Sequence, residues 1–170
     1  ELVVGTQFPL SGPLAAITMP AVRIGTEIAV KRVNEAQLAG KGNTIKALIE
    51  DNASDVKQAI TLMSRFAISD HVIAAAGVVG TALSLPTAPV ANVNKTPLLA
   101  IASSPAVAQS GPWSFNIVET PTTQTNALSG LMIDKLHARN VALVYDRGND
   151  ASVRLRDILA KILKDHGVNV

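Results

Sequence analysis

The segment from Val72 to Ser104, VIAAAGVVGTALSLPTAPVANVNKTPLLAIASS, restricts the possible fold more than any other part of the chain. It holds two apolar runs, Val72–Ala76 and Pro97–Ala102, which are too short for helices and are bounded by small or turn residues. Both runs are therefore predicted to be buried strands. The connection between them has the length of one helix. A strand, a crossover helix and a second fully apolar strand form a βαβ unit, so the predicted fold class is α/β with a parallel sheet.

Strands and helices alternate through the rest of the first 120 residues. Thr18 can cap a helix that has Pro20 in its first turn, and Gly25 is expected to let this helix pack closely on the sheet. Pro86 and Pro89 fall in the helix of the βαβ unit, which is placed between Ala82 and Asn94, so we expect its first turn to be irregular. The other predicted strands are Leu2–Phe8, Thr44–Glu50 and Trp113–Val118, and the apolar helix faces are Val22, Gly25, Ala29, Val33 and Ala36, then Val56, Ala59, Ile60, Met63, Phe66 and Ala67.

The alternation starts again after a crossing segment at Glu119–Thr123, which contains Pro121. A strand is predicted at Asn140–Tyr145, and Val168–Val170 begins another. We therefore expect one complete domain over residues 1–120 and the truncated start of a second domain over residues 121–170. The helices of this second part have predicted apolar faces made of Leu128, Leu131, Met132 and Leu136, then Leu155, Ile158, Leu159, Ile162 and Leu163.

Composition excludes several classes of function. Hydrophobic residues make up 48% of the chain, but the longest apolar runs are far too short to span a bilayer. The net charge of +2 comes from scattered residues and aromatics make up only 3%, so a nucleic-acid partner is not expected. The chain has no cysteine, which excludes thiolate metal sites, thiol catalysis and disulfide bonds.

Motifs for enzymatic chemistry are missing from the sequence. There is no G-x-G-x-x-G after the first predicted strand, no Walker sequence and no G-x-S-x-G elbow. Carboxylates paired beside a base are lacking, and the three histidines are isolated near the ends of elements. We therefore expect a protein that is not an enzyme and that needs no cofactor or metal.

Small polar residues follow the two strands of the βαβ unit. Gly80 and Thr81 come after the first strand, and Ser103 and Ser104 come after the second. Ligands of open α/β sheets bind at the carboxyl ends of the strands, and a hydroxyl with free N–H groups at a helix start can bind an anion without a formal charge. The competing interpretation is that Thr81 and Ser104 only cap helices.

Another group of polar residues follows the strand Thr44–Glu50. We interpret Asp51, Ser54 and Asp55 as a capped turn before the next helix.

Several segments together resemble a known family. They are VVGTQFPLSGPLA, VNEAQLAGKGN, IKALIEDNASDVKQAI, the segment Val72–Ser104 and NVALVYDRGND. In order and spacing they resemble the type I periplasmic binding proteins, and more narrowly the leucine/isoleucine/valine-binding (branched-chain amino-acid) class of substrate-binding proteins of ABC transporters. The resemblance covers essentially the whole chain. It implies two Rossmann-like lobes joined by crossing hinge strands, of which this chain supplies a complete first lobe, 1–120, and part of the second, 121–170.

The resemblance also implies roles for individual residues. Thr81 and Ser104 would bind the carboxylate of an amino-acid ligand, and the carbonyl of Ala102 would accept from its ammonium group. Gly80 and Ser103 belong to the same predicted site. The loop Leu14–Thr18 corresponds to a segment that packs on the ligand, with Ile17 as the expected contact. Asp150 stands where the family usually has an aromatic residue, so it would face an ammonium, amide or hydroxyl group of the ligand, or cap the helix that follows.

The function that the resemblance implies is that of an extracytoplasmic solute-binding protein whose signal peptide has been removed. It would close around a small carboxylate ligand by a hinge at Glu119–Thr123 and deliver it to an ABC permease in the membrane. The ligand could be an aliphatic amino acid, an amide, or an aromatic or aliphatic carboxylic acid. Alternatives are the ligand-binding sensor domain of a receptor and a regulator core of the lactose-repressor type. A truncated chain of this kind, with open strand edges, would be prone to dimerise.

Overall fold

A computed structural model describes residues 1–147 and 150–170, and within these it leaves the side chains of residues 17–21, 150 and 151 undescribed. The chain divides into two compact units, Glu1–Val118 and Glu119–Val170. Each unit is described here by itself.

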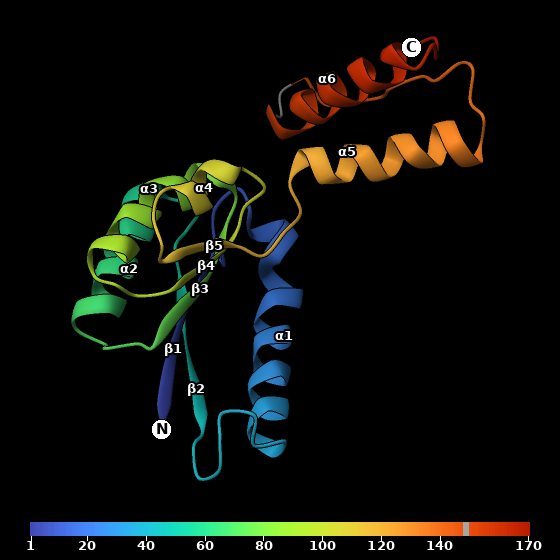
Figure 1. The fold of residues 1–170 in the computed structure, drawn as a ribbon. Helices are drawn as coiled ribbons and strands as arrows, with labels where there is room; N and C mark the ends of the chain where they lie inside the picture. The colour runs from blue at the N-terminus through green and yellow to red at the C-terminus, as the bar shows by residue number, and fades with distance from the viewer. Residues whose placement is uncertain (148–149) are drawn as a thin grey trace. The chain divides into compact units, whose positions relative to one another are not determined.

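The first unit is built on a parallel sheet of five strands in the order β2-β1-β3-β4-β5 (Figure 1). All four neighbouring pairs are parallel, so the predicted α/β class with a parallel sheet is confirmed. Because parallel strands point the same way, the loops that follow them all leave from one edge of the sheet. The strands are β1 (Leu2–Phe8), β2 (Ile45–Asp51), β3 (Ala74–Val79), β4 (Leu98–Ile101) and β5 (Ser114–Asn116).

Helices cover both faces of this sheet, with α1 on one side and α2 and α3 on the other (Figure 1). The four helices of the unit are α1 (Ala15–Glu35), α2 (Val56–Ile68), α3 (Thr81–Val93) and α4 (Pro105–Gln109). Helix α2 has the apolar face expected from its periodicity, because Ala59, Met63 and Phe66 are fully buried. Phe66 lies against the backbone of β1, where a Cβ on Gly5 would come within 2.7 Å of its ring. The core continues through Ala75, Val78, Leu83, Ala88, Ala91, Leu98, Ala100, Ala102 and Val107.

Helix α1 begins at Ala15, before the predicted cap at Thr18, so the expectation of a loop over Leu14–Thr18 is wrong from Ala15 onward. The early start depends on a partner distant in sequence. The N–H of Leu14 donates to the hydroxyl of Ser54, 3.1 Å away, which satisfies a group at the helix start. A cap supplied from another loop leaves no signal in the local sequence.

The predicted apolar face of α1 is confirmed only in part, because Val22 and Val33 are half-buried. Gly25, Ala29 and Ala36 are exposed, and a Cβ on Gly25 would meet open space rather than the sheet. Val30, which is not on the predicted face, is half-buried as well. Small residues on one side of a helix fit the expected pattern equally well when that side faces solvent, so periodicity alone does not identify the buried face.

The strand predicted at Val72–Ala76 starts two residues later and continues to Val79. The prediction stopped at Gly77 because a glycine is a common strand boundary. In the structure Gly77 lies inside β3 with a φ of +92°, at an irregularity of the β3–β4 register, and a Cβ there would come within 2.3 Å of the Phe8 ring. Glycine is needed here for both its backbone conformation and its lack of a side chain.

Helix α3 runs without a break from Thr81 to Val93 and contains both Pro86 and Pro89. The expected irregular first turn is therefore not found. Each proline lacks a backbone N–H, so each removes one hydrogen-bond donor from the helix. Nearby hydroxyls add other bonds, because Thr87 donates to the Leu83 carbonyl and Ser84 donates to the Val78 carbonyl.

The strand predicted at Trp113–Val118 is found only in part, because β5 is limited to Ser114–Asn116. Asn92 of α3 holds the start of this strand, since its amide donates to the Ser114 hydroxyl at 2.8 Å and accepts from the Trp113 N–H at 2.9 Å.

The second unit contains α5 (Pro121–Gly130), a π-helical turn η1 (Leu131–Lys135) and α6 (Asp150–Asp165). Its small core consists of Leu159, Leu163 and Val168, with Met132 and Leu143 packed against them. The apolar face predicted for α6 is found in the structure, whereas the face predicted for α5 and η1 is largely exposed. Leu159 and Leu163 are buried as expected, but Leu128, Leu131 and Leu136 are 41, 48 and 65% exposed. The π-helical turn adds a residue to one turn, which rotates Leu136, the residue after it, away from the side that a regular α-helix would present.

The strand predicted at Asn140–Tyr145 does not form. This segment makes only one parallel bridge, between Asn140 and Asn169, and Val144 is 99% exposed. The expected start of a strand at Val168–Val170 is reduced to the same bridge. A strand needs neighbouring strands to satisfy its backbone, and in this unit the described residues provide only Asn169 and its neighbours for that purpose.

The burial of Phe66 provides a test of this core. Replacing Phe66 by Ala should lower the free energy of unfolding by about 3–5 kcal/mol, because it removes a ring that is fully buried against β1. Denaturant unfolding measures this loss. Ile68→Ala is the control on the same helix, since Ile68 is 60% exposed and its removal should change stability by no more than about 0.5 kcal/mol. Equal effects of the two substitutions would contradict the packing described.

Candidate functional site

The ends of β3 and β4 lie side by side and bring five of the predicted ligand residues together. Val79 pairs with Ile101, and the N–H of Gly80 donates to the carbonyl of Ile101 at 2.9 Å. The chain leaves these two strands directly into the residues that the sequence singled out. They are Gly80 and Thr81 after β3 and Ala102, Ser103 and Ser104 after β4.

The residues after β3 form the start of α3. Gly80 is the N-cap residue with a φ of +88°, and Thr81 is the first residue of the helix and is half-buried. The N–H groups in the first turn of a helix have no acceptor within it, and the helix dipole makes this end positive. This corner of the sheet therefore favours a negatively charged group.

The residues after β4 add a hydroxyl and a carbonyl to the same corner. Ala102 is buried at 2% exposure, and Ser103 and Ser104 are half-buried. Ser104 stands at the N-cap position of α4, but its hydroxyl makes no capping hydrogen bond. Its carbonyl instead accepts from the Asn116 side chain at 2.8 Å, which fixes the backbone of this turn.

The hydroxyls of Thr81 and Ser104 have no hydrogen-bond partner among the described residues. Neither of them caps a helix, so the capping interpretation does not account for their presence. A half-buried hydroxyl without a protein partner is available to a ligand.

Two further predicted ligand residues cannot be placed in this group. Ile17 belongs to α1, but its side chain lies outside the described part of the structure. Asp150 is the first residue of α6 in the second unit, and its side chain also lies outside the description.

Asp51 has a larger structural role than the sequence indicated. Its Oδ1 accepts from the N–H groups of Leu10, Ser11 and Ala53 at 2.9, 3.1 and 2.7 Å, and its Oδ2 accepts from the Ser11 hydroxyl at 2.6 Å. The turn after β2 was expected to be capped locally, and Asp55 does cap α2 by accepting from the Gln58 N–H. Asp51 reaches instead to the loop after β1. The parallel β1–β2 register, which pairs Phe8 with Asp51, places the two loops beside each other.

These contacts lower the pKa of Asp51. Burial alone would raise the pKa of this carboxyl, but the hydrogen bonds from the Ser11 hydroxyl and from the N–H groups of Ala53, Ser11 and Leu10 outweigh that effect and hold the pKa below its usual value. The carboxylate form is therefore the one that binds the loop.

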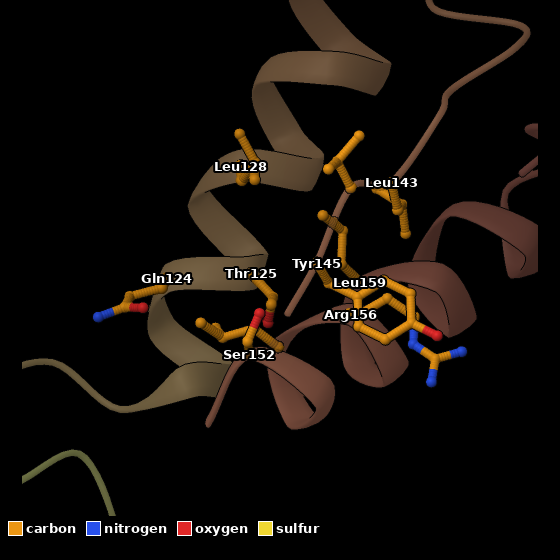
Figure 2. A pocket seen from close by; sticks show the side chains of 10 residues that line it. Gln124, Thr125, Leu128, Leu143, Tyr145, Ser152, Arg156 and Leu159 are labelled. Carbon is orange, nitrogen blue, oxygen red and sulfur yellow. The ribbon is translucent and has the colours of Figure 1, made fainter. Parts of the chain in front are cut away.

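The second unit has a pocket of its own. It has a volume of about 260 Å³ between α5, α6 and the segment around Tyr145 (Figure 2). Two of its polar groups already have partners, since the Thr125 hydroxyl donates to the Pro121 carbonyl and the Ser152 hydroxyl accepts from the Asp146 N–H. Arg156 lies over the Tyr145 ring at 4.3 Å. Most of the lining consists of leucine, valine and tyrosine side chains. We take the ends of β3 and β4 as the candidate site, because two hydroxyls without a partner among the described residues follow these strands.

Comparison with known families gives a match over the whole chain. A family described as "Periplasmic binding protein" matches residues 1–170. Among curated proteins, the Leu/Ile/Val-binding protein homolog 1 of Brucella melitensis biotype 1 is 26% identical over 181 residues, which cover 100% of this chain and 47% of that protein. The chain thus spans about half the length of the curated relatives it matches.

Solved structures of similar fold include two with bound ligands. The substrate-binding protein of a branched-chain amino acid transporter from Streptococcus pneumoniae, in complex with isoleucine, has a TM-score of 0.78 and 23% identity, covering 94% of this chain and 46% of that one. A solute-binding protein of an ABC transporter from Rhodopseudomonas palustris BisB5, in complex with 3,4-dihydroxybenzoic acid, has a TM-score of 0.74 and 19% identity, covering 99% of this chain and 45% of that one. At these identities the likeness establishes the fold.

The pKa of Asp51 predicts how stability depends on pH. A carboxyl whose pKa is lower in the folded state than in the unfolded state stabilises the fold above the unfolded pKa of about 4, and this contribution is lost as the pH falls through the lowered value. Asp51→Asn removes the titrating group. The difference in unfolding free energy between the original protein and this variant should therefore be largest near pH 6 and should shrink below pH about 4. Urea unfolding across that range measures it, and a difference that does not change with pH would contradict the role of the carboxylate.

Proposed function

The chain belongs to the periplasmic binding protein family, and from this we propose that it forms the ligand-capturing part of an extracytoplasmic solute-binding protein that serves an ABC transporter. The observation that carries the proposal is the pair of hydroxyls, on Thr81 and Ser104, that have no hydrogen-bond partner in the part of the chain that the structure describes and that follow the adjoining ends of β3 and β4.

We propose that this corner binds the carboxylate of a small ligand. The hydroxyls of Thr81 and Ser104 would donate to the carboxylate oxygens, and the first N–H groups of α3 would add further donors. Gly80 would line the same corner with its backbone alone, and Ser103 would add a third hydroxyl. The site would bind the negative charge of the ligand with neutral hydrogen-bond donors. A lysine or arginine in their place would be a buried, unpaired cation whenever the site is empty, which is unfavourable.

The carbonyl of Ala102 is proposed to accept from the ammonium group of an amino-acid ligand. It is well placed for this role because Ala102 is buried and its carbonyl receives no hydrogen bond from the described residues. A ligand without an ammonium group would leave this carbonyl unpaired. The relatives of this fold include one with isoleucine and one with 3,4-dihydroxybenzoic acid, and both of those ligands carry a carboxylate. The ligand class proposed here is therefore small carboxylates, either amino acids or organic acids.

We further propose that the two units are lobes of one binding protein, with residues 1–120 as the first lobe and residues 121–170 as the start of the second. Ile17 would contact the ligand from the first lobe and Asp150 from the second. The ligand would bind to the first lobe, and closure at the crossing segment Glu119–Thr123 would follow. Closure is favoured only if the ligand makes better contacts in the closed state than in the open one. The permease would then bind the closed form.

The proposed role is in binding and transport, without a catalytic step. Members of the family are extracytoplasmic binding proteins, and extracytoplasmic placement is proposed for this chain. Within the described part of the chain, every helix is too short or too polar to cross a membrane.

A thermal-shift screen of the full-length protein tests the ligand class. The panel contains leucine, isoleucine, valine, 3,4-dihydroxybenzoate and 4-hydroxybenzoate, with leucinamide as a matched compound that lacks the carboxylate. A ligand at 100 times its Kd stabilises the fold by about 2.7 kcal/mol, which is readily visible as a higher Tm. We expect at least one carboxylate to raise the Tm and leucinamide to leave it unchanged. Stabilisation by leucinamide equal to that by leucine, or none by any carboxylate, would contradict the proposal.

Substitution of the two hydroxyls tests the site itself. Thr81→Val and Ser104→Ala should each weaken binding of the stabilising carboxylate by about 1–3 kcal/mol, because each removes a donor to a buried charge. Isothermal titration calorimetry measures the change. Thr61→Val is the matched control, since Thr61 is exposed on α2 and its hydroxyl bonds only to the Lys57 carbonyl within that helix. An unchanged affinity in the double variant Thr81→Val/Ser104→Ala would exclude this site.

A further inference from the structure

The loop after β1, residues 9–14, borders the same edge of the sheet as the proposed ligand site. Strand β1 lies next to β3, and the two are parallel, so this loop and the start of α3 leave the sheet from one edge. Leu14, at the end of the loop, packs against the apolar core that includes Ala102 and Leu83. The position of the loop therefore affects the surroundings of the site.

Two backbone hydrogen bonds join neighbouring residues at the two ends of the loop. The Leu10 N–H donates to the Phe8 carbonyl, and the Ala15 N–H donates to the Gly12 carbonyl. Gly12 has a φ of +79°, a conformation that glycine adopts at little cost. Neither bond fixes the loop relative to the sheet beyond the end of β1.

The loop after β2 restrains this loop through side-chain hydrogen bonds. Asp51 binds the N–H groups of Leu10 and Ser11 and the Ser11 hydroxyl. Ser54 accepts from the Leu14 N–H and donates to the Ser11 carbonyl, each at 3.1 Å. The two loops are in direct contact, because a Cβ on Gly12 would come within 2.3 Å of the Ala53 carbonyl oxygen.

We propose that Asp51 is a positioning residue for ligand binding, which fixes the loop 9–14 and the first turn of α1 beside the ligand held at Thr81, Ala102 and Ser104. The inference rests on the proposed function. A carboxylate suits this role because its two oxygens accept four hydrogen bonds here, three to N–H groups and one to a hydroxyl. An amide has only one acceptor oxygen, and alanine has none.

Loss of Asp51 would act at a distance from the ligand. Without the carboxylate, the Ser11 N–H would turn to water and the Leu10 N–H would keep only its bond to the Phe8 carbonyl. The Leu14–Ser54 bond that starts α1 would lose its support. Ile17 follows in the first turn of α1. The loop would then sample several positions, and ligand binding would have to select one of them, which lowers the apparent affinity.

The test compares Asp51→Ala with Asp55→Ala in the full-length protein. Both variants remove a carboxylate between the end of β2 and the start of α2. The Asp51 carboxylate binds the N–H groups of Leu10 and Ser11, whereas the Asp55 carboxylate caps α2 through the Gln58 N–H. Amide hydrogen exchange of Leu10 and Ser11, followed by NMR, reports on the loop. Calorimetry with L-isoleucine and 3,4-dihydroxybenzoate as probes reports on binding.

We expect Asp51→Ala to accelerate exchange at Leu10 and Ser11 and to weaken binding of the probe by about 3- to 30-fold. Asp55→Ala should lower the Tm but leave both readouts unchanged. Asp51→Asn, which keeps one acceptor oxygen, should give intermediate values, and it remains available if the alanine variant does not fold.

Each other outcome has a definite meaning. Unchanged exchange at Leu10 and Ser11 would overturn the positioning role. Faster exchange with unchanged affinity would show that the loop does not serve ligand binding, while the proposed function would stand. Equal losses of affinity in Asp51→Ala and Asp55→Ala would show that a general loss of stability causes the weaker binding, and this result would also overturn the inference. If the original protein bound neither probe, the proposed ligand class and this inference would fail together.

Discussion

The parallel pairing of β3 with β4 is the interaction on which the rest of the first unit depends. It places the ends of two buried strands next to each other, with Val79 opposite Ile101, and each strand then continues into a helix. The N-terminal end of α3 and the turn before α4 therefore meet at one corner of the sheet. Backbone groups beyond the end of a strand have no further ladder to join, so this corner offers polar groups that a ligand can bind.

The polar groups around this edge divide into two kinds. Asp51 and Ser54 are satisfied within the protein, and each of them joins parts of the chain that are distant in sequence. The hydroxyls of Thr81 and Ser104 are left without partners among the described residues. Since an unpaired half-buried polar group costs free energy, the contrast separates groups that stabilise the fold from groups that are free to bind a ligand.

The sequence predicted the elements better than their boundaries. The strand–helix–strand pattern, the buried face of α2 and the closeness of Thr81 to Ser104 all follow from local composition, because short apolar runs and parallel topology dictate them. The start of α1 was wrong because Ser54 supplies its cap from another loop, and the end of β3 was wrong because Gly77 packs under Phe8. The role of Asp51 was missed for the same reason as the start of α1. Each of these features depends on a contact between residues far apart in the chain, and no window of neighbouring residues records such a contact.

The cross-link between the loops after β1 and β2 shows how a parallel sheet can make a precise edge from irregular segments. A parallel strand fixes where the loop after it begins, but it does not fix the path of that loop, since loops have few regular backbone hydrogen bonds. A single carboxylate that accepts bonds from both loops removes this freedom at once, because Asp51 binds Leu10 and Ser11 on one loop and Ala53 on its own. The same carboxylate must remain ionised to do so, and the hydrogen bonds that it accepts lower its pKa and keep it ionised. Position and charge state therefore support each other, so the ordered edge needs neither a metal nor a disulfide between Asp51 and the loop that it holds.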